Sequence, residues 1–401
     1  MFNNSLDRIY LNQLGMVSPL GRTLGESKHA LLELVRSGVV LSDAYSPGRA
    51  LPIGRIDPSW TLPGLDDRPL AQRSRNNQLA LAALVQIRPA IDCAIERFGS
   101  ARVGVIVGTS TSGISEAETA VRDYLSTGAL PERFHYGQQE LASPATVLAE
   151  ELGISGPAYV HSSACASSAK ALASAARLIL MDACDAVVAG GVDTLCRFTI
   201  AGFAALESLS MTRCNPLSRN RDGINIGEGA ALFLVSREPA AVMLSGWGES
   251  SDGYHMSAPD PSGAGARIAL EQALRRAAVT AAEIEYVNLH GTATAQNDAM
   301  EARLIDQVFG DRVCVSSTKP MTGHALGAAG AIEAALCWLT MQDENSTGKL
   351  PAHLWDGARD PALPVLQLAT AASSLGHPPR WTLSNSFAFG GANVTLVLGR
   401  D

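Results

Sequence analysis

One cysteine occupies a position where it could act as a nucleophile. Cys165 lies in the segment VHSSACASSAKALASAARLIL, where a short strand is expected to lead through a polar loop into a helix that begins near residue 166. The free N–H groups and partial positive charge of a helix N-terminus favour a thiolate, so this position predicts a lowered thiol pKa. The alternative is a small buried apolar residue, which we expect of the other cysteines.

Two histidines occupy similar positions. His290 follows the apolar run YVNL, and His324 lies five residues after Lys319 at the start of an Ala/Gly-rich stretch. A single histidine in such a place is more often structural than catalytic. However, Cys165, His290 and His324 all lie at strand-to-helix junctions, where α/β folds bind ligands, so we expect them to converge. A helix N-terminus also disfavours imidazolium, which predicts a neutral His324 that donates an N–H to a developing oxyanion.

Two further segments carry weaker signals. The turn NSFAFGGAN lets backbone N–H groups approach a substrate, and Phe387 and Phe389 could line an apolar channel; a purely structural turn is the alternative. Asp298 and Glu301 are three residues apart on one helix face, typical of a solvated face unless Glu301 turns back to hold Lys319. Neither HExxH, nor zinc-spaced cysteines, nor a phosphate-binding glycine motif occurs, so we expect no metal and no nucleotide cofactor.

The elements that must position these residues read as an α/β fold. Short apolar runs alternate with long helical stretches, and runs that are apolar at consecutive positions suit strands covered by helices on both faces. The two halves also resemble each other, since each has a polar loop, an Ala-rich helix and a glycine turn before an apolar strand. Such weakly polar helices belong in a middle layer between two sheets, and Gly327 and Gly330 would let a neighbouring backbone come close. We place the halves at residues 1–238 and 239–401.

Composition excludes several functions. Of the 401 residues 46% are hydrophobic and 17% charged, and the net charge is −8, which disfavours nucleic acid and anionic membranes as partners. The N-terminus lacks the features of a secretory signal, and residues 324–341 read as a buried helix rather than a membrane span. Seven cysteines without a CxxC pair indicate reduced thiols and a cytoplasmic location.

Over nearly its whole length the sequence resembles the β-ketoacyl-acyl carrier protein synthases, condensing enzymes of the thiolase superfamily. This resemblance implies a five-layered αβαβα fold of two duplicated halves, usually dimeric. The motifs that carry it are SSACASSAKA around Cys165, GGVDTL at 190–195, RDGINIGEGAALFL at 221–234, GESSDGYHMSAPDP at 248–261, NLHGTATAQND at 288–298, SSTKPMTGHALGAAGAIEA at 316–334 and NSFAFGGAN at 385–393.

The resemblance also implies roles for individual residues. Cys165 would accept an acyl chain as a thioester, and His290 and His324 would bind malonyl-carrier protein and stabilise the enolate formed by decarboxylation. Backbone N–H groups of Cys165 and Phe389 would form the oxyanion hole. Lys319, with Glu301, would hold the His324 loop. Thr292 and Thr294 would bind phosphopantetheine, which enters with the carrier protein, so no cofactor is required.

The sequence departs from the family pattern at three places. Ala388 replaces a glycine, Leu217-Ser218 replaces Phe-Asp, and Thr111 stands where an acyl-pocket gate is expected. These departures concern chain length and starter preference. The residues of several motifs more narrowly resemble those of aryl polyene-type ketosynthases. The competing assignment is an enzyme of housekeeping fatty acid elongation.

The resemblance names partners as well as chemistry. It implies an acyl carrier protein and either a homodimer or a heterodimer with a chain-length-factor-like subunit. An acidic enzyme needs a local basic patch to bind an acidic carrier, for which we expect Arg68, Arg73 and Arg75; a solvated face is the alternative. Two other functions stay open: an inactive chain-length-factor-like subunit, and a thiolase or acyltransferase that uses coenzyme A esters.

Overall fold

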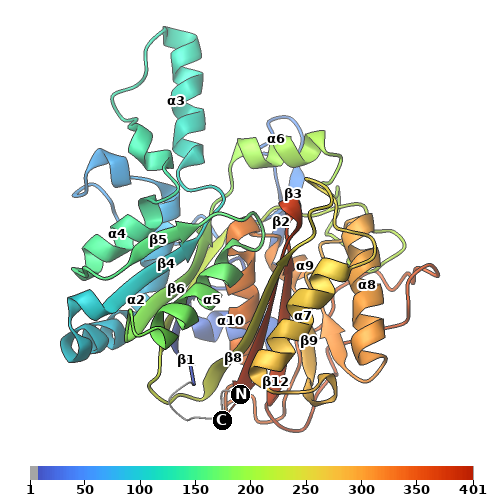
Figure 1. The fold of residues 1–401 in the computed structure, drawn as a ribbon. Helices are drawn as coiled ribbons and strands as arrows, with labels where there is room; N and C mark the ends of the chain where they lie inside the picture. The colour runs from blue at the N-terminus through green and yellow to red at the C-terminus, as the bar shows by residue number, and fades with distance from the viewer. Residues whose placement is uncertain (1–7, 401) are drawn as a thin grey trace.

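The computed structural model describes residues 8–400 and is organised around one series of 11 hydrogen-bonded strands (Figure 1). Their order is β11-β10-β9-β12-β13-β8-β1-β7-β6-β4-β5, and β2 and β3 form a separate hairpin. The strands are β1 (Tyr10–Val17), β2 (Val39–Ser42), β3 (Leu51–Gly54), β4 (Val103–Gly108), β5 (Ala158–His161), β6 (Ala186–Asp193), β7 (Gly229–Ser236), β8 (Val242–Ser251), β9 (Tyr286–Asn288), β10 (Cys314–Ser316), β11 (Gln367–Leu368), β12 (Trp381–Phe387) and β13 (Ala392–Arg400).

The strand order consists of two equivalent halves. In the first, β1 and β6 flank β7 in antiparallel pairs, and β6, β4 and β5 are parallel. In the second, β8 and β12 flank β13 in antiparallel pairs, and β12, β9 and β10 are parallel. The halves join where Tyr10 of β1 pairs with Met243 of β8. The predicted duplication is therefore confirmed, and the predicted division at 238/239 falls in the turn between β7 and β8.

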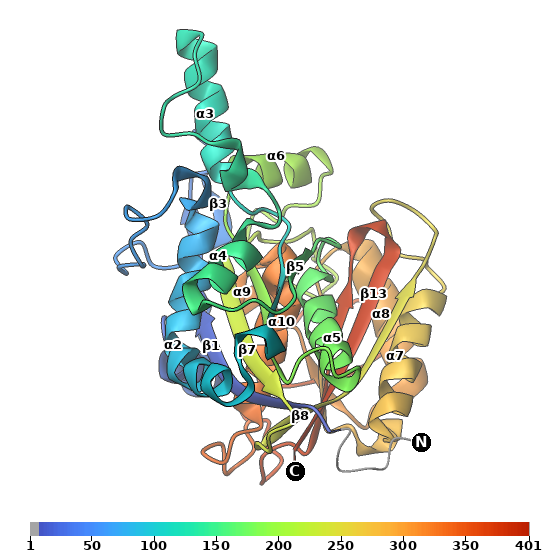
Figure 2. The ribbon, with the colours of Figure 1, turned by 60° about the vertical axis from the view of Figure 1, so that its left-hand side comes forward.

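The principal helices cover both faces of these half-sheets. Helices α2 and α4 pack outside the first half, α7 and α8 pack outside the second, and α5 and α10 lie between the halves (Figure 2). This is the predicted five-layered αβαβα arrangement. The α-helices are α1 (Leu24–Lys28), α2 (Arg75–Phe98), α3 (Ile114–Thr127), α4 (Ser143–Leu152), α5 (Ser167–Leu180), α6 (Arg197–Ala205), α7 (Ala264–Ala277), α8 (Ala295–Phe309), α9 (Lys319–Thr322) and α10 (Ala329–Thr340).

Small side chains explain how the two middle helices fit between the half-sheets. A Cβ at Gly330 of α10 would lie 2.9 Å from the Cβ of Ala169 in α5, and one at Gly327 would lie 2.7 Å from Ser110 Oγ. The close approach predicted for both glycines is thus confirmed. It brings the segments that precede α5 and α10 together, and these segments carry Cys165 and His324.

The apolar runs read from the sequence are strands β4, β6, β7, β9 and β13. Strands β1, β8 and β12 were not predicted, because polar residues interrupt their apolar pattern. Among the described residues one helix, α2, has the length and hydropathy of a membrane span, but it packs against β1 and β7 as an outer-layer helix. The stretch 324–341 is the buried segment ending in α10, as expected.

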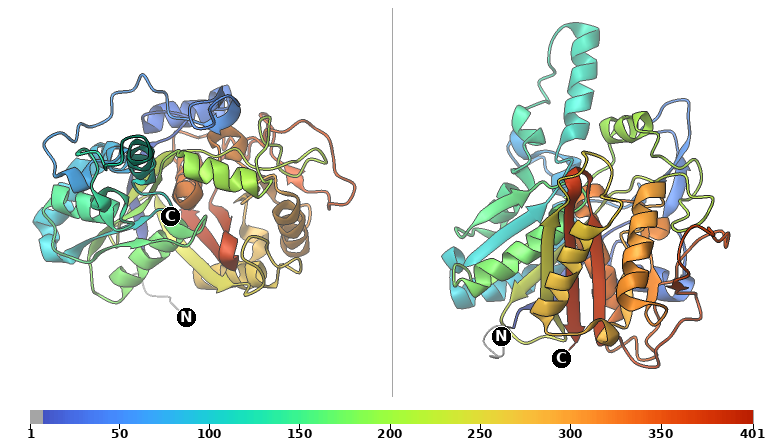
Figure 3. Two further views of the ribbon diagram at one scale, coloured as in Figure 1. Left: turned by 90° about the horizontal axis from the view of Figure 1, so that it is seen from above. Right: turned by 45° about the vertical axis from the view of Figure 1, so that its right-hand side comes forward.

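Helices α3 and α6 stand apart from these layers. Both lie above the strand ends in Figure 1, and α3 projects away from the layered body. The view from above shows α6 crossing over the ends of the central strands (Figure 3).

Candidate active site

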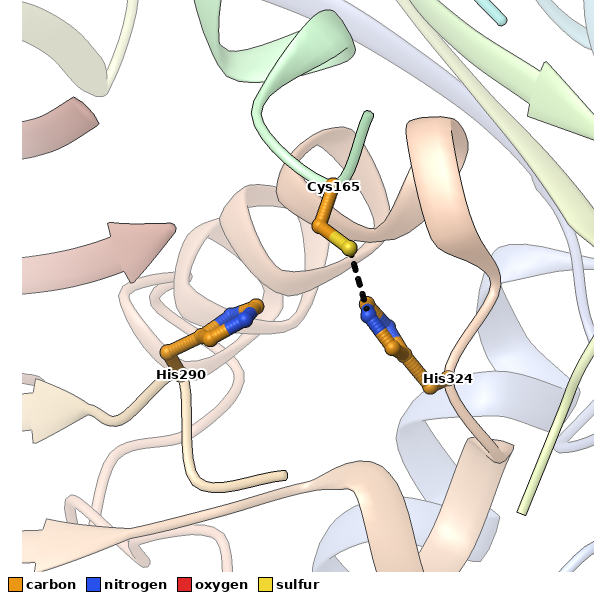
Figure 4. Close-up of side chains that lie close together, drawn as sticks. All are labelled: Cys165, His290 and His324. Carbon is orange, nitrogen blue, oxygen red and sulfur yellow. Dashed lines mark hydrogen bonds between the residues drawn. The ribbon is translucent and has the colours of Figure 1, made fainter. Parts of the chain in front are cut away.

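Cys165, His290 and His324 meet in the interior of the molecule (Figure 4). The Cys165 sulfur and one imidazole nitrogen of each histidine lie within 4.8 Å of one another, and His324 Nε2 is 2.9 Å from Cys165 Sγ. The two imidazole rings are 5.4 Å apart in an edge-to-face arrangement. The three strand-to-helix junctions that carry these residues therefore meet at one site, as the sequence analysis predicts.

Cys165 sits in a sharp turn between β5 and α5. The preceding residue, Ala164, has φ of 45°, an unfavourable conformation for a residue with a Cβ, and its carbonyl accepts a hydrogen bond from Ser167 Oγ at 2.6 Å. Burial raises the pKa of the Cys165 thiol to about 12, while Lys319 acts in the opposite direction. The predicted lowering of this pKa is therefore wrong, because desolvation outweighs the helix end.

The turn that carries His290 is held by the carboxylate of Glu301, which the sequence analysis had linked to Lys319 instead. Glu301 of α8 accepts the backbone N–H groups of His290 and Gly291 at 2.8 and 2.7 Å. It also accepts a hydrogen bond from Asn385 Nδ2 at 3.2 Å. Glu301 thus fixes the turn that carries His290. It makes no direct ion pair with Lys319 among the described residues, although, against the burial that raises the pKa of Glu301, the Lys319 charge acts to lower it.

The carboxylate partner of Lys319 is Glu333. The Lys319 ammonium is buried, forms an ion pair with Glu333 of α10 and donates a hydrogen bond to the His290 carbonyl. It also lies 3.4 Å from His290 Nδ1. Sequence reasoning missed Glu333, although one carboxylate in an otherwise apolar helix is a signal, because a buried charge needs a partner of opposite sign.

His324 is tied to the first half of the fold. Its backbone N–H donates to the Asn225 carbonyl at 2.7 Å, and its Nδ1 has no hydrogen-bond partner among the described residues. Burial and then the Lys319 charge hold the pKa of His324 well below its usual value, and burial, Lys319 and His324 do the same for the pKa of His290. The lowered pKa agrees with the predicted neutral state of His324. The cause is burial and not the N-terminus of a helix, because α10 begins at Ala329, five residues after His324.

A pocket of about 70 Å³ opens onto the three side chains. Its rim includes Thr292 and Thr294, whose hydroxyls are 2.9 Å apart. Phe387 lies against His290 and Phe389 stacks on Phe203, with ring centroids 6.0 and 5.5 Å apart. The lining residues that the sequence did not single out are Phe203, Ser208, Ile224, Ser257, Pro259, Gln296, Asn297 and Asn393.

Asp298 supports the rim and is not part of a solvated face. It is fully buried and accepts the backbone N–H groups of Ala293 and Leu217 at 3.2 and 2.7 Å. Ala293 has φ of 64° and lies between the two rim threonines. The carboxylate therefore stabilises the turn that presents Thr292 and Thr294.

Thr111 does not line the pocket. It is fully buried, and its hydroxyl donates to Asp193 at 2.9 Å. Asp193, which sequence reasoning missed, also accepts the backbone N–H groups of Ser110 and Thr111 at 2.8 and 2.9 Å and that of Gly327 at 2.6 Å. The predicted gate residue therefore belongs to a network that joins the 109–111 loop to the segment after His324.

Of the other two departures from the family pattern, Ala388 lines the pocket and Leu217-Ser218 lies outside it. Ala388 has φ of −101° and ψ of 156°, an extended conformation open to any residue, whereas Gly390 and Gly391 have φ of 80° and 78°. Alanine is thus accommodated at 388 without strain. Ser218 is bound to Asp356 at 2.8 Å, and Leu217 lines a separate surface groove.

The three arginines predicted to receive a carrier protein are engaged within the chain. Arg75 makes two hydrogen bonds to the buried Glu228, at 3.0 and 2.7 Å, and Arg68 forms an ion pair with Glu151. Arg73 donates to the backbone carbonyls of Arg68 and Asp66, both at 2.8 Å. Arg68 and Arg75 are thus paired with carboxylates, whereas Arg73 binds carbonyl oxygens; a role of the three in docking a carrier protein stays a prediction.

A thiol and two imidazoles at this spacing also constitute a donor set for a soft divalent ion such as zinc. The same three groups are those that nucleophilic acyl transfer needs, with a nucleophile in hydrogen-bond contact with a proton acceptor. That the reaction needs no metal or cofactor stays a prediction.

Comparison with known proteins identifies the family. The sequence profile of the beta-ketoacyl synthase N-terminal domain matches residues 63–241, and that of the C-terminal domain matches residues 241–352. The chain belongs to the beta-ketoacyl synthase family. A 3-oxoacyl-[acyl-carrier-protein] synthase 2 from Coxiella burnetii is 30% identical to this synthase, with 98% of each chain covered.

Solved structures agree with this assignment. The ketosynthase ApeO from Xenorhabdus doucetiae, solved in complex with its chain length factor ApeC, gives a TM-score of 0.92 at 44% identity over 100% of both chains. The ishigamide ketosynthase/chain length factor gives 0.86 at 26% identity, with 98% of this chain and 99% of that one covered. The synthase therefore has the thiolase-like ketosynthase fold and is an acyltransferase of the condensing type.

Proposed function

We propose that this synthase lengthens an acyl chain held on Cys165 by decarboxylative condensation with malonyl-carrier protein, in an aryl polyene-type pathway. The observation that carries the proposal is the contact of 2.9 Å between Cys165 Sγ and His324 Nε2, with His290 completing the group inside a buried pocket. A nucleophile, a proton acceptor and a second neutral donor are then all in reach of one substrate carbonyl.

In the first step Cys165 accepts the acyl group. Because its pKa is raised to about 12, the thiol carries its proton at neutral pH and must release it during attack. His324 Nε2 is placed to take that proton and return it to the departing pantetheine sulfur. The bond from the acyl carbon to pantetheine sulfur breaks as the bond to Cys165 sulfur forms.

In the second step the two histidines act as neutral donors. Lys319 lies 3.4 Å from His290 Nδ1 and favours the tautomer with hydrogen on Nε2. The second N–H requires that His324, whose Nε2 accepts a proton in the first step, has changed to the tautomer with hydrogen on Nε2. Two N–H groups can then bind the carbonyl oxygen of the malonyl thioester and stabilise the enolate left when its carboxylate departs as carbon dioxide. The enolate carbon attacks the acyl carbon, and the bond from that carbon to Cys165 sulfur breaks. The sulfur then takes up one proton from solvent by way of His324, which balances the loss of the malonyl carboxylate as neutral carbon dioxide.

The backbone N–H groups of Cys165 and Phe389 are our candidates for the oxyanion hole of that attack. Neither has an acceptor among the loop and turn hydrogen bonds of the described residues. The hydroxyls of Thr292 and Thr294, at the rim of the pocket, would hold the phosphopantetheine arm. Phosphopantetheine arrives on the carrier protein, and the loss of carbon dioxide drives the reaction, so the proposal includes no resident cofactor.

The pathway and partners rest on similarity. ApeO, which is 44% identical to this chain, was solved with a chain length factor, and this supports a heterodimer with such a subunit over a homodimer. We further propose an acyl carrier protein as substrate donor. The seven free cysteines suit a reducing, cytoplasmic location.

Intact-mass analysis after incubation with acyl-carrier protein or with acyl-coenzyme A tests the function. We expect an acyl adduct from the carrier protein that disappears in Cys165→Ala, whereas Cys93→Ala, which changes an exposed cysteine, retains it. An adduct from coenzyme A alone would indicate a thiolase or acyltransferase, and no adduct would indicate an inactive subunit. Product analysis with malonyl-carrier protein and the co-purifying subunit would then show whether a conjugated polyene forms.

A further inference from the structure

Helix α6 covers the pocket but is itself only lightly packed. Of its nine residues only Ile200 is buried, and Ile200 and Phe203 join a small apolar cluster that includes Ile224. Phe203 stacks on Phe389, with ring centroids 5.5 Å and ring planes 30° apart, and both rings line the pocket together with Cys165. The position of α6 therefore controls whether this pair of rings closes the pocket.

The N-terminus of α6 is capped by a residue of another helix. Glu118 of α3 accepts the backbone N–H of Arg197 at 3.1 Å and also that of Phe198. Cys196, the residue before α6, is not one of the types that usually cap a helix. The free N–H groups and partial positive charge of a helix N-terminus make a carboxylate a favourable partner. Glu118 therefore supplies a cap that α6 lacks in its own sequence.

Glu118 projects from the end of α3 that is fixed to the body of the molecule. Near that end Glu116 accepts the backbone N–H of Arg75 at 2.9 Å, and Ser112 Oγ donates to the Glu140 carbonyl at 2.7 Å. Glu118 is the fifth residue of α3, which begins at residue 114, and the far end of the helix projects away from the layers. The cap on α6 is therefore attached to a rigid support.

We propose that Glu118 is a positioning residue that keeps the pocket closed over Cys165, because its cap on α6 holds Phe203 against Phe389. Loss of the cap shifts α6 from its docked position toward a displaced one, in which water and solutes reach the thiol. The closure itself is independent of the proposed function. Its benefit rests on that function: a closed pocket slows hydrolysis of the acyl thioester, in which water gives the free acid and the bond to sulfur breaks to return the Cys165 thiol.

The first test is the rate at which iodoacetamide alkylates Cys165 in the full chain at one fixed pH, followed by peptide mass spectrometry. In Glu118→Ala we expect a rise of about 2- to 30-fold, the change in equilibrium constant that corresponds to loss of a helix N-cap. The exposed Cys93 is the internal reference. Asp123→Ala, which removes a carboxylate of α3 that pairs with Arg133, is the matched control and should react as wild type does. A wild-type rate in Glu118→Ala would overturn the proposal.

The second test asks whether Glu118 acts through Phe203. In a Phe203→Ala background, Glu118→Ala should add little to the alkylation rate, because the ring that the cap positions is already gone. Glu118→Gln should react at a rate between those of wild type and Glu118→Ala, since glutamine keeps an acceptor oxygen but lacks the charge that suits a helix N-terminus. An equal rise from Glu118→Ala in both backgrounds would show that the two residues act independently and would reject the proposal.

Hydrolysis of the acyl-enzyme tests the benefit of closure. After Cys165 is acylated from acyl-carrier protein, intact mass without malonyl-carrier protein should show the acyl group lost faster from Glu118→Ala than from wild type, by the same factor as alkylation. Equal loss from both proteins would contradict the protective role. Failure of the carrier protein to acylate wild type would reject the proposed function, whereas the alkylation result, which needs no carrier protein, would still decide whether Glu118 closes the pocket.

Discussion

At the scale of the residue, two opposing effects act on the nucleophile. The N-terminus of α5 favours a thiolate, but a charge near a helix end is worth only ~0.3–1 kcal/mol at the surface. Burial of Cys165 in the pocket floor acts the other way and raises its pKa to about 12. Position in the sequence reveals the helix end, whereas the depth of burial depends on the assembled fold, and here burial prevails.

This balance predicts how the reactivity of Cys165 depends on pH. Below the pKa of a thiol, the thiolate fraction rises about tenfold per pH unit. The rate of alkylation of Cys165 by iodoacetamide, followed by peptide mass spectrometry, should therefore keep rising from about pH 6 to about pH 9. The exposed Cys93 in the same digest serves as the internal reference. A plateau near neutral pH would mean that the helix end outweighs burial.

The buried pair of Lys319 and Glu333 predicts an asymmetry between single and double variants. Removing one partner of a buried ion pair costs about 3–5 kcal/mol, since the other charge is left unpaired, while replacing both with apolar residues is often neutral. Lys319→Met should therefore lower the free energy of unfolding in urea by that amount, and Lys319→Met/Glu333→Leu should recover most of it.

Activity should behave differently from stability in the same two variants. Both lack the ammonium near His290 Nδ1, so both should have a lowered kcat for condensation. Recovered stability with kcat still low separates the role of Lys319 in the site from its role in folding. Equal stability of the single variant and wild type would contradict the unpaired-charge argument.

At the scale of the element, packing between α5 and α10 sets the geometry of the site. A Cβ at Gly330 would lie 2.9 Å from Ala169 Cβ and 3.0 Å from its backbone nitrogen. Overpacking typically costs about 1–3 kcal/mol. Gly330→Ala should therefore destabilise the chain in urea denaturation and slow acyl transfer, because it separates the helices that follow Cys165 and His324.

Gly25→Ala is the matched control for that substitution. Gly25 lies in α1, and a Cβ there would meet nothing within 4 Å. Alanine favours a helix by up to about 1 kcal/mol over glycine, so this variant should be as stable as wild type or slightly more stable. If both variants behaved alike, close packing at Gly330 would not be the cause.

The sequence alone predicts the elements of this fold better than the contacts between them. The buried strands, the two middle helices and the junctions of Cys165, His290 and His324 follow from apolar runs and from residue type. The partners of Glu301, Lys319 and Thr111 do not, because each depends on which segments meet across the fold. Asp193 shows the same limit, since it binds residues 110 and 327, which are far apart in the chain.

At the scale of the whole molecule, the two halves share one core. Helix α10 belongs to the second half, yet it packs with α5 in a single apolar cluster that includes strands of both halves. His324 donates its backbone N–H to Asn225 of the first half. The catalytic group is likewise divided, with Cys165 in one half and both histidines in the other.

A shared core predicts that neither half folds alone. Residues 1–238 without α10, and residues 239–401 without α5, would each expose the apolar face that the partner helix covers, and that burial is the main favourable contribution to folding. The intact chain should therefore unfold in one transition in calorimetry, with equal calorimetric and van't Hoff enthalpies. Each half expressed separately should give no cooperative transition, and mixing the halves should restore acylation of Cys165. Two resolved transitions in the intact chain, or a cooperatively folded isolated half, would show that the halves are independent domains joined at the site.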